Sequence, residues 1–295
     1  MIMTQTHIEH PEDTILTGDL SVFDILYDVA SISMKMDGIS LVWGTNPANG
    51  EFFVCTKSAF NKKKIRLCYT QEDIEFHFGH QPDLAQKLSF CLTYLPRTDN
   101  IYWGDFLGFG GTDTFQPNTI AYVFPEEIDS FLVIAPHTQV YVHNEMWDAI
   151  CEPLQETFSD SAAIKWVQPS VDRLYAPARA PKINPDTIPF LSKKEAEIAK
   201  QEINSVIKSG KELDDATLTE ILGSPQLANL YQFVIEIKED LMDSFIIHDA
   251  PMSFIFEDVQ IDGEGFIFHS ENYGTIKLVD REIFSYANFA TGKFQ

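Results

Sequence analysis

A lysine, a carboxylate and a glycine stand together in the run Lys35-Met36-Asp37-Gly38. A lysine amine becomes a nucleophile when it loses its proton, so a site that uses Lys35 must favour the free base through neighbouring cations or partial desolvation. Gly38 would allow close backbone approach, and Asp37 would position the loop. A four-residue pattern of common residues also arises by chance, so its interpretation depends on the segments that follow it.

Four later segments carry the groups that transfer at phosphorus needs. Such a reaction spreads negative charge over phosphate oxygens, which lysines and Mg²⁺ stabilise, and a pair of carboxylates such as Asp105 and Glu264 holds a hard cation. In chain order the segments are Thr56-Lys57-Ser58, Trp103-Gly104-Asp105-Phe106-Leu107, Glu264-Gly265-Phe266-Ile267 and Thr275-Ile276-Lys277-Leu278-Val279. Individually these residues are typical of exposed or structural positions, and only their order favours a shared site.

The ordered set resembles the motifs of the covalent nucleotidyltransferase superfamily, which contains ATP-dependent DNA ligases, RNA ligases and mRNA capping enzymes. The resemblance implies that Lys35 attacks the α-phosphate of a nucleoside triphosphate, releases pyrophosphate and carries a lysyl-NMP. ATP is the expected donor, GTP is the alternative, and Mg²⁺ or Mn²⁺ is the expected metal. The implied nucleotide-binding residues are Asp37, Gly38, Lys57, Tyr122 and Lys277, and the implied metal ligands are Asp105 and Glu264.

The sequence also departs from the family pattern. Tyr122 is placed only loosely as the aromatic residue that stacks on the base, and Asp105 stands where the family often has Glu. Position 279 is Val where a second lysine is usual, which leaves Arg281 as the candidate substitute. Few residues follow Lys277, so no OB-fold domain of the kind that ligases and capping enzymes use is expected.

Two functions remain open at this stage. One is a nucleotidyltransferase that forms lysyl-NMP, expected to be lysyl-AMP, as in a minimal RNA or DNA ligase of the kind that bacteriophages encode. The alternative is a catalytically reduced ligase-fold protein that binds nucleotide or a protein partner and joins no nucleic acid. The first chemical step is expected to be retained, because the sequence keeps Lys35, Asp105, Glu264 and Lys277.

The charge of the chain argues against nucleic acid as a partner. With 21 basic and 44 acidic residues the net charge is −23, so the long-range field repels a polyanion. A protein acceptor remains open. The one compact basic patch comprises Lys57, Lys62, Lys63, Lys64 and Arg66.

Other features indicate an intracellular protein. No apolar stretch approaches the length that spans a bilayer, and the four cysteines form no C-x-x-C pair, so a cytoplasmic location, in the host if the gene is viral, is expected. His77 and His80 with Cys68 and Cys91 fit no standard zinc spacing. Gly108, Gly110 and Gly111 lack the ending of a P-loop.

These residues need strands and turns to position them. We expect a single α+β domain over 1–295, a ligase-type, ATP-grasp-like arrangement of antiparallel sheets flanked by helices, with a helical insertion at about 144–250. Asn49-Gly50 between apolar runs at 39–43 and 51–56 predicts a hairpin directly after Lys35. Helices are predicted at 21–30, 192–209 and 227–244, and Ser192 with Glu195 three residues further on predicts a capping box at the start of the second. Evenly spaced prolines at 168–189 predict an extended connection. Further strands are predicted at 101–103, 120–124, 131–135, 139–143, 252–259, 265–269 and 275–279.

Overall fold

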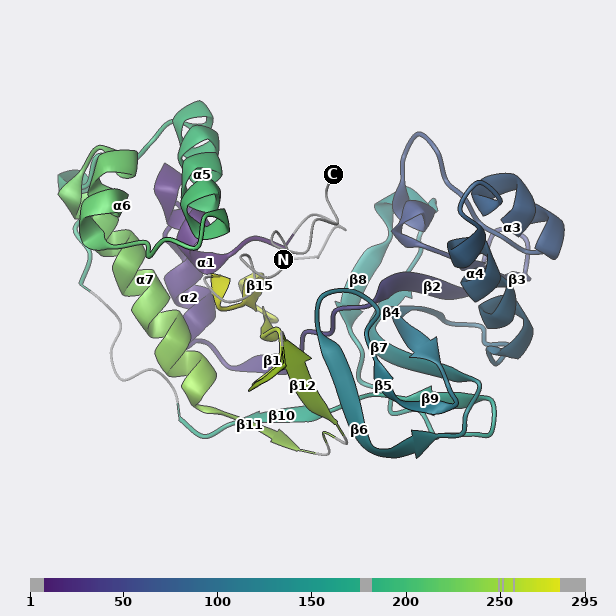
Figure 1. Ribbon diagram of the computed structural model, residues 1–295. Coiled ribbons are helices and arrows are strands. Elements are labelled where there is room, and N and C mark those ends of the chain that lie inside the picture. The colour runs from purple at the N-terminus through teal and green to yellow at the C-terminus, as the bar shows by residue number, and fades with distance from the viewer. Residues whose placement is uncertain (1–7, 176–181, 249, 251, 257, 282–295) are drawn as a thin grey trace.

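The computed structural model describes residues 8–175, 182–248, 250, 252–256 and 258–281. It is an α+β structure with three sheets, whose strands pair antiparallel except at one short parallel contact. Figure 1 shows a helix-covered sheet on each side of the molecule, and a third sheet that closes the space between them at one end. None of the described helices is long and apolar enough to cross a membrane.

The six-stranded sheet follows from the predicted hairpin. Gly50 adopts a left-handed φ of +73° in the turn between β2 and β3, a conformation that glycine reaches at little cost. Trp43 and Phe53 are fully buried in one apolar cluster with residues of the two neighbouring helices, α3 (Gln71–Phe78) and α4 (Pro82–Tyr94). The strands run in the order β3 (Glu51–Cys55), β2 (Ile39–Asn46), β4 (Ile101–Phe109), β7 (Leu132–Tyr141) and β8 (Ile150–Pro153), with β9 (Ile164–Trp166) parallel to β7.

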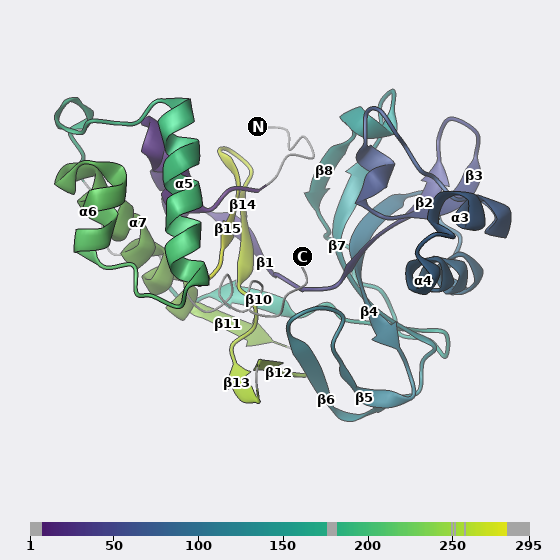
Figure 2. The same cartoon turned by 45° about the horizontal axis from the view of Figure 1, so that its top comes forward.

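The five-stranded sheet pairs a strand from the early part of the chain with strands from its late part. Its order is β11 (Phe245–His248), β10 (Ser170–Arg173), β1 (Ala30–Met34), β14 (Phe266–Ser270) and β15 (Gly274–Leu278). Phe268 and Leu278 are fully buried against a helical layer. Figure 2 shows this layer beside the sheet, and its helices are α1 (Pro11–Thr14), α2 (Ser21–Tyr27), α5 (Lys193–Lys208), α6 (Asp215–Leu222) and α7 (Pro225–Asp243).

The four-stranded sheet joins the two larger units. Its order is β13 (Val259–Ile261), β12 (Ser253–Phe256), β6 (Ala121–Ile128) and β5 (Thr112–Phe115). Met34 and Met36, at the end of β1, are buried in the same apolar cluster as Phe254 of β12. Single turns of 3-10 helix complete the described elements: η1 (Ile15–Thr17), η2 (Lys57–Phe60), η3 (Met146–Asp148) and η4 (Pro185–Thr187).

The predicted elements and the structure differ in several places. The segment expected to be a helical insertion is helical only over α5 to α7, because residues 150–173 contribute β8, β9 and β10. These strands are three or four residues long, too short to show alternation, and β10 pairs with β1 and β11, which are distant in sequence. The strands predicted at 131–135 and 139–143 are one strand, β7, whereas α3 and α4 were not predicted. Residues 176–181 of the proline-rich connection lie outside the described residues.

Helix α5 begins with the predicted capping box. Ser192 Oγ accepts from the Glu195 N–H at 3.3 Å, and Glu195 Oε2 accepts from the Ser192 N–H at 2.8 Å. Ser192→Ala is expected to lower the free energy of unfolding by about 1 kcal/mol, measured by urea denaturation. Ser205→Ala, at an exposed position of the same helix, serves as the control and should leave stability unchanged or slightly raised. Equal effects of the two changes would contradict a capping role.

Candidate active site

A cavity of about 830 Å³ lies between the five-stranded and the six-stranded sheets. Its walls come from β1, β10, β14 and β15 on one side and from β2, β4, β7 and β8 on the other. The volume is that of a small-molecule site. Most of the sequence-predicted residues line it: Lys35, Asp37, Gly38, Lys57, Asp105, Glu264 and Lys277.

Lys35 and Glu264 form an ion pair at the centre of this group. Met34 lies opposite Phe266 in the antiparallel pair of β1 and β14, and this register places the residue after β1 beside the residues before β14. The Lys35 N–H donates to the Gly265 carbonyl at 2.8 Å, and Lys35 Nζ donates to Glu264 Oε1. Burial raises the pKa of Glu264, an effect that Lys35 opposes. Glu264 Oε2 is buried and has no hydrogen-bond partner among the described residues.

Asp105 faces this pair from β4. Its neighbour across the strand pair is Ser40, and Gly38 packs so closely that an added Cβ would lie 2.6 Å from the Asp105 Cβ. Because Gly38 has no side chain, the loop can pack closely against β4. Burial raises the pKa of Asp105 to about 7, with Lys35 acting in the opposite direction and Glu264 adding to the rise.

Two further lysines complete the charged lining. Lys57 lies in η2, which follows β3, with its Nζ 5.3 Å from the centre of the Trp103 ring. Lys277 lies opposite Ile267 in the pair of β14 and β15. Burial lowers the pKa of Lys277, and the charge of Lys35 lowers it further. Three cations and several carboxylates therefore share one partly desolvated space.

Asp37 holds the loop that carries Lys35. Its carboxylate accepts from Asn118 Nδ2 at 2.9 Å and from the Thr119 N–H at 3.1 Å. Its backbone N–H donates to the Tyr122 hydroxyl at 2.6 Å. The expected positioning by Asp37 is thus visible as three contacts to the segment before and within β6.

Tyr122 does not line the cavity, where the resemblance had placed an aromatic residue that stacks on a base. It is 1% exposed and packs edge-on against Phe254, with ring centres 5.6 Å apart. The reason is that β6 belongs to the four-stranded sheet and does not pair with β4. The Tyr122 hydroxyl contacts the backbone of Asp37 and so helps to hold the loop that carries Lys35.

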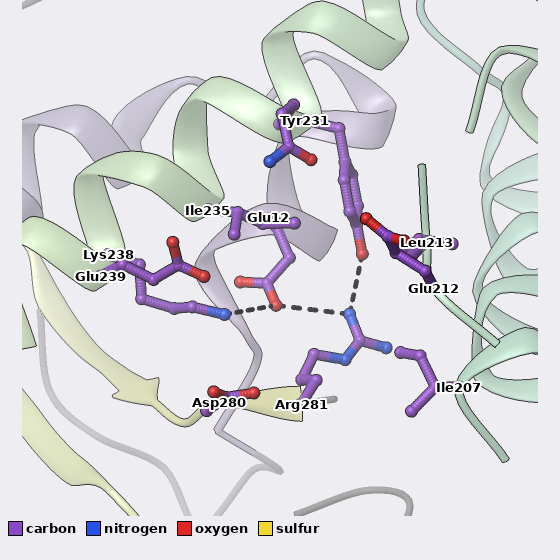
Figure 3. Close-up of a pocket in the computed structure, with 11 residues that line it drawn as sticks. Glu12, Ile207, Glu212, Leu213, Tyr231, Ile235, Lys238, Glu239, Asp280 and Arg281 are labelled. Atoms are coloured by element: carbon purple, nitrogen blue, oxygen red, sulfur yellow. Dashed lines mark hydrogen bonds and ion pairs between the residues drawn. The ribbon is translucent and has the colours of Figure 1, made fainter. Parts of the chain in front are cut away.

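Arg281 also lies away from the cavity. Figure 3 shows it beside a separate cavity of about 250 Å³ in the helical layer. Its Nη1 donates to Asp13 Oδ1 at 2.8 Å and to the Tyr231 hydroxyl at 2.8 Å, and its Nη2 donates to Asn204 Oδ1 at 2.9 Å. Arg281 thus does not line the cavity, although its charge is close enough to contribute to the lowered pKa of Lys277.

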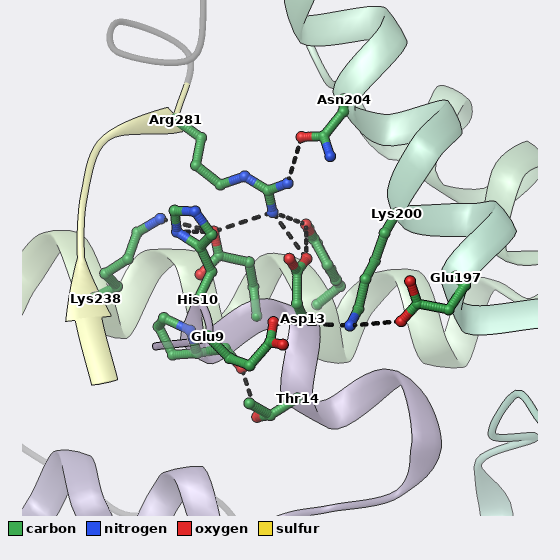
Figure 4. A network of polar contacts seen from close by, with 12 residues as sticks. Glu9, His10, Asp13, Thr14, Glu197, Lys200, Asn204, Lys238 and Arg281 are labelled. Atoms are coloured by element: carbon green, nitrogen blue, oxygen red, sulfur yellow. Dashed lines mark hydrogen bonds and ion pairs between the residues drawn. The ribbon is translucent and has the colours of Figure 1, made fainter. Parts of the chain in front are cut away.

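A buried network surrounds Arg281 (Figure 4). Glu12 is fully buried and accepts from Lys238 Nζ at 3.1 Å, with Arg281 Nη1 3.4 Å away. The pKa of Glu12 is lowered to about 2 because these cations outweigh the effect of burial. The network ties α1, α7 and the chain after β15 into one unit.

Several cavity residues carried no signal in the sequence. His137 of β7 lies beside Trp103, with ring centres 5.4 Å apart, and its Nε2 is 3.5 Å from Asp105 Oδ2. Burial lowers the pKa of His137 to about 4, so the ring is neutral at neutral pH. Ile267 and His10 line the opposite wall. Only the register of β4 with β7 and of β1 with β14 would have placed His137 and Ile267 at the site.

The cavity offers few protein ligands to a cation. Within the part of the chain that the structure describes, no group of three or more His, Cys, Asp or Glu side chains is arranged to hold a metal ion. The predicted pair, Asp105 and Glu264, does line the same cavity. Any divalent cation there would take its remaining ligands from water or a bound phosphate, as Mg²⁺ commonly does.

The pKa of Asp105 predicts a pH dependence of cation binding. Below about pH 7 the carboxyl is protonated in the free protein, so Mn²⁺ affinity should fall as the pH is lowered through this value, by up to about tenfold per unit. Calorimetric titration with Mn²⁺ on both sides of this pH measures it. The Asp105→Asn variant should bind Mn²⁺ weakly, with an affinity that does not change through this pH range. Asp113→Asn, at an exposed position, should bind Mn²⁺ as the wild type does. An unchanged pH profile in Asp105→Asn would contradict the assignment.

Fold and cavity together define an α+β protein in which lysines and carboxylates from separate segments share one ligand-sized space. The chain belongs to DUF6267, a family of unknown function, whose sequence pattern matches residues 5–219 and residues 192–293. No curated protein and no solved structure matches it.

Proposed function

We propose that the protein is a ligase-type nucleotidyltransferase that forms a covalent lysyl-nucleotide at Lys35, with ATP as the donor and GTP as the alternative. One observation carries the proposal. Lys35, Lys57, Asp105, Glu264 and Lys277 come from segments spread over most of the chain, and all line a single cavity. Chance placement of surface residues would scatter them.

The chemistry assigned to Lys35 is an in-line displacement. Its Nζ attacks the α-phosphorus, a P–N bond forms, the P–O bond to pyrophosphate breaks, and the amine gives up its proton. The Lys35 ammonium must first pass a proton to its ion-pair partner Glu264 or to water, because attack requires a lone pair on nitrogen, and the second proton leaves to water as the P–N bond forms. Lys277, whose own pKa is lowered by burial and by the charge of Lys35, supplies a cation that balances the negative charge developing on the phosphate oxygens.

The residues present fit a divalent cation. Asp105 and Glu264 provide hard carboxylate oxygens, and the buried Glu264 Oε2 is a lone acceptor without a partner among the described residues. A bound Mg²⁺ or Mn²⁺ would neutralise charge on the phosphates during transfer. The ion would also compete with Lys35 for Glu264, which links metal binding to release of the lysine.

The walls of the cavity suit a nucleobase. Trp103 and His137 present flat rings on one side, and Ile267 lines the opposite sheet. A planar ring between aromatic and aliphatic surfaces is held by stacking and by apolar burial. These residues take the place proposed from the sequence for Tyr122.

Self-labelling tests the proposal. The wild-type protein is incubated with ATP or GTP and Mg²⁺ or Mn²⁺, and intact mass spectrometry then measures its mass. An increment of one NMP, located by peptide mapping to the segment that contains Lys35, is the expected result. Absence of an increment with both nucleotides and both metals would reject covalent transfer.

A second candidate is a catalytically reduced protein of the same type that binds nucleotide or a protein partner. Val279, directly after β15, supplies no second lysine, and Arg281 is engaged in the helical layer, so fewer cations line the cavity than the resemblance implies. In that case calorimetry would detect nucleotide binding and the mass would not change. Nucleic acid or a protein as the final acceptor stays a separate question that labelling does not address.

A further inference from the structure

The basic loop, residues 57–66, is the one dense group of cations in a chain of net charge −23. No Asp or Glu occurs between residues 52 and 71. Among the described residues, none of its cations forms an ion pair, although acidic residues outnumber basic ones twofold in the protein. The members are Lys57, Lys62, Lys63, Lys64 and Arg66.

The loop is fixed at both ends and in the middle. Val54 and Cys68 exchange backbone hydrogen bonds of 3.0 and 3.1 Å, which close its base. The Asn61 side chain accepts from the N–H groups of Lys63 and Lys64 at 2.9 and 3.0 Å. The exposed lysines are therefore presented by an ordered turn, which reduces the entropy that a ligand must remove on binding.

The loop lies beside the cavity. Its first member, Lys57, lines the cavity wall together with Cys151 of β8. Lys62 Nζ lies 4.2 Å from the ring centre of Trp147, in the turn just before β8. Cations thus continue from the cavity wall on to the surface next to β8.

We propose that Lys62, Lys63 and Lys64 bind the β- and γ-phosphates of a nucleoside triphosphate whose α-phosphate lies near Lys35. The proposal rests on the proposed function for the identity of the donor, but the binding of a polyphosphate can be tested without any transfer. The triphosphate tail carries concentrated negative charge, and an ammonium group on a flexible stem binds phosphate as a point charge. In this arrangement Lys57 joins the cavity to the loop.

A phosphate tail fits the loop better than a nucleic-acid strand does. The basic surface is a single turn, while the rest of the chain repels a long polyanion. Trp147, which could otherwise stack on an exposed base, holds Lys62 by a cation–π contact. A short, highly charged ligand gains the local attraction and avoids most of the repulsion.

Calorimetric titration with inorganic tripolyphosphate tests the assignment. The variant Lys62→Ala/Lys63→Ala/Lys64→Ala removes three exposed side chains and should weaken tripolyphosphate binding by about tenfold or more, while AMP binding stays unchanged. Lys193→Ala/Lys194→Ala/Lys211→Ala removes the same charge from exposed positions of the helical layer and should bind as the wild type. Tripolyphosphate cannot form a lysyl-nucleotide, so this titration tests the inference independently of the transfer reaction.

Three outcomes would overturn the inference. The loop variant could bind tripolyphosphate with wild-type affinity, or the two triple variants could lose affinity equally, which would indicate a net-charge effect only. If the loop variant lost affinity for a single-stranded oligonucleotide but kept its affinity for tripolyphosphate, the loop would be a binding site for a nucleic-acid strand.

Discussion

Lys35→Ala is expected to abolish the NMP mass increment, a loss of at least about 1,000-fold in the rate of self-labelling. The change removes the only atom proposed to form the bond to phosphorus, and peptide mapping shows whether Lys57 or Lys277 of the same cavity is labelled in its place. Intact mass spectrometry after incubation with the nucleotide and metal that label the wild type measures the effect.

Lys35→Arg is the sharper variant for the same prediction. A guanidinium keeps the charge that Glu264 contacts but is not a nucleophile at neutral pH, so the fold and the ion pair should persist while labelling is lost. Lys194→Ala, at an exposed position of α5, should label normally. Labelling of Lys35→Arg at the wild-type rate would move the nucleophile to another residue.

Arg281→Met is expected to lower the free energy of unfolding by about 3–5 kcal/mol. The substitution keeps an unbranched side chain of moderate size but removes the guanidinium that contacts Asp13, Tyr231 and Asn204. Glu12 and Asp13 would then remain buried with one cation, Lys238, near Glu12. Urea denaturation followed by far-UV circular dichroism measures the change.

The control for this variant is Lys211→Met, which removes a cation from an exposed position near the same cavity wall. Its effect should stay within about 0.5 kcal/mol. If Arg281→Met costs less than about 1 kcal/mol, the buried network contributes little to stability, and Arg281 would have to be explained in another way.

Local signals in the sequence predicted much of the fold. The Asn49-Gly50 turn and its flanking apolar runs predicted the hairpin of β2 and β3, and Ser192 with Glu195 predicted the start of α5. Each of these features depends on residues close together in the chain. The general α+β class with antiparallel sheets is confirmed for the same reason, since turns and periodicity report local conformation.

The assembly of the candidate site depended on which strands pair. Lys35, Asp105 and Glu264 were identified by residue type and order, but their meeting in one cavity comes from the pairing of β1 with β14 and of β2 with β4. Tyr122 was misplaced because the sequence does not reveal that β6 pairs with β12, and His137 was missed because its place follows from the register of β7. Arg281 was misplaced because its partners in the buried network, Glu12 and Asp13, lie near the other end of the sequence, and the sequence does not reveal this contact.

The two crossings between the large sheets give the molecule a mechanical property. The chain passes directly from the five-stranded to the six-stranded sheet through residues 35–38, and it returns through residues 167–169, and both crossings line the cavity. If the sheets move relative to one another, these short connections act as the hinge. The width of the cavity and the direction of the Lys35 amine would then change together, so a ligand that draws the sheets closer would also aim the lysine.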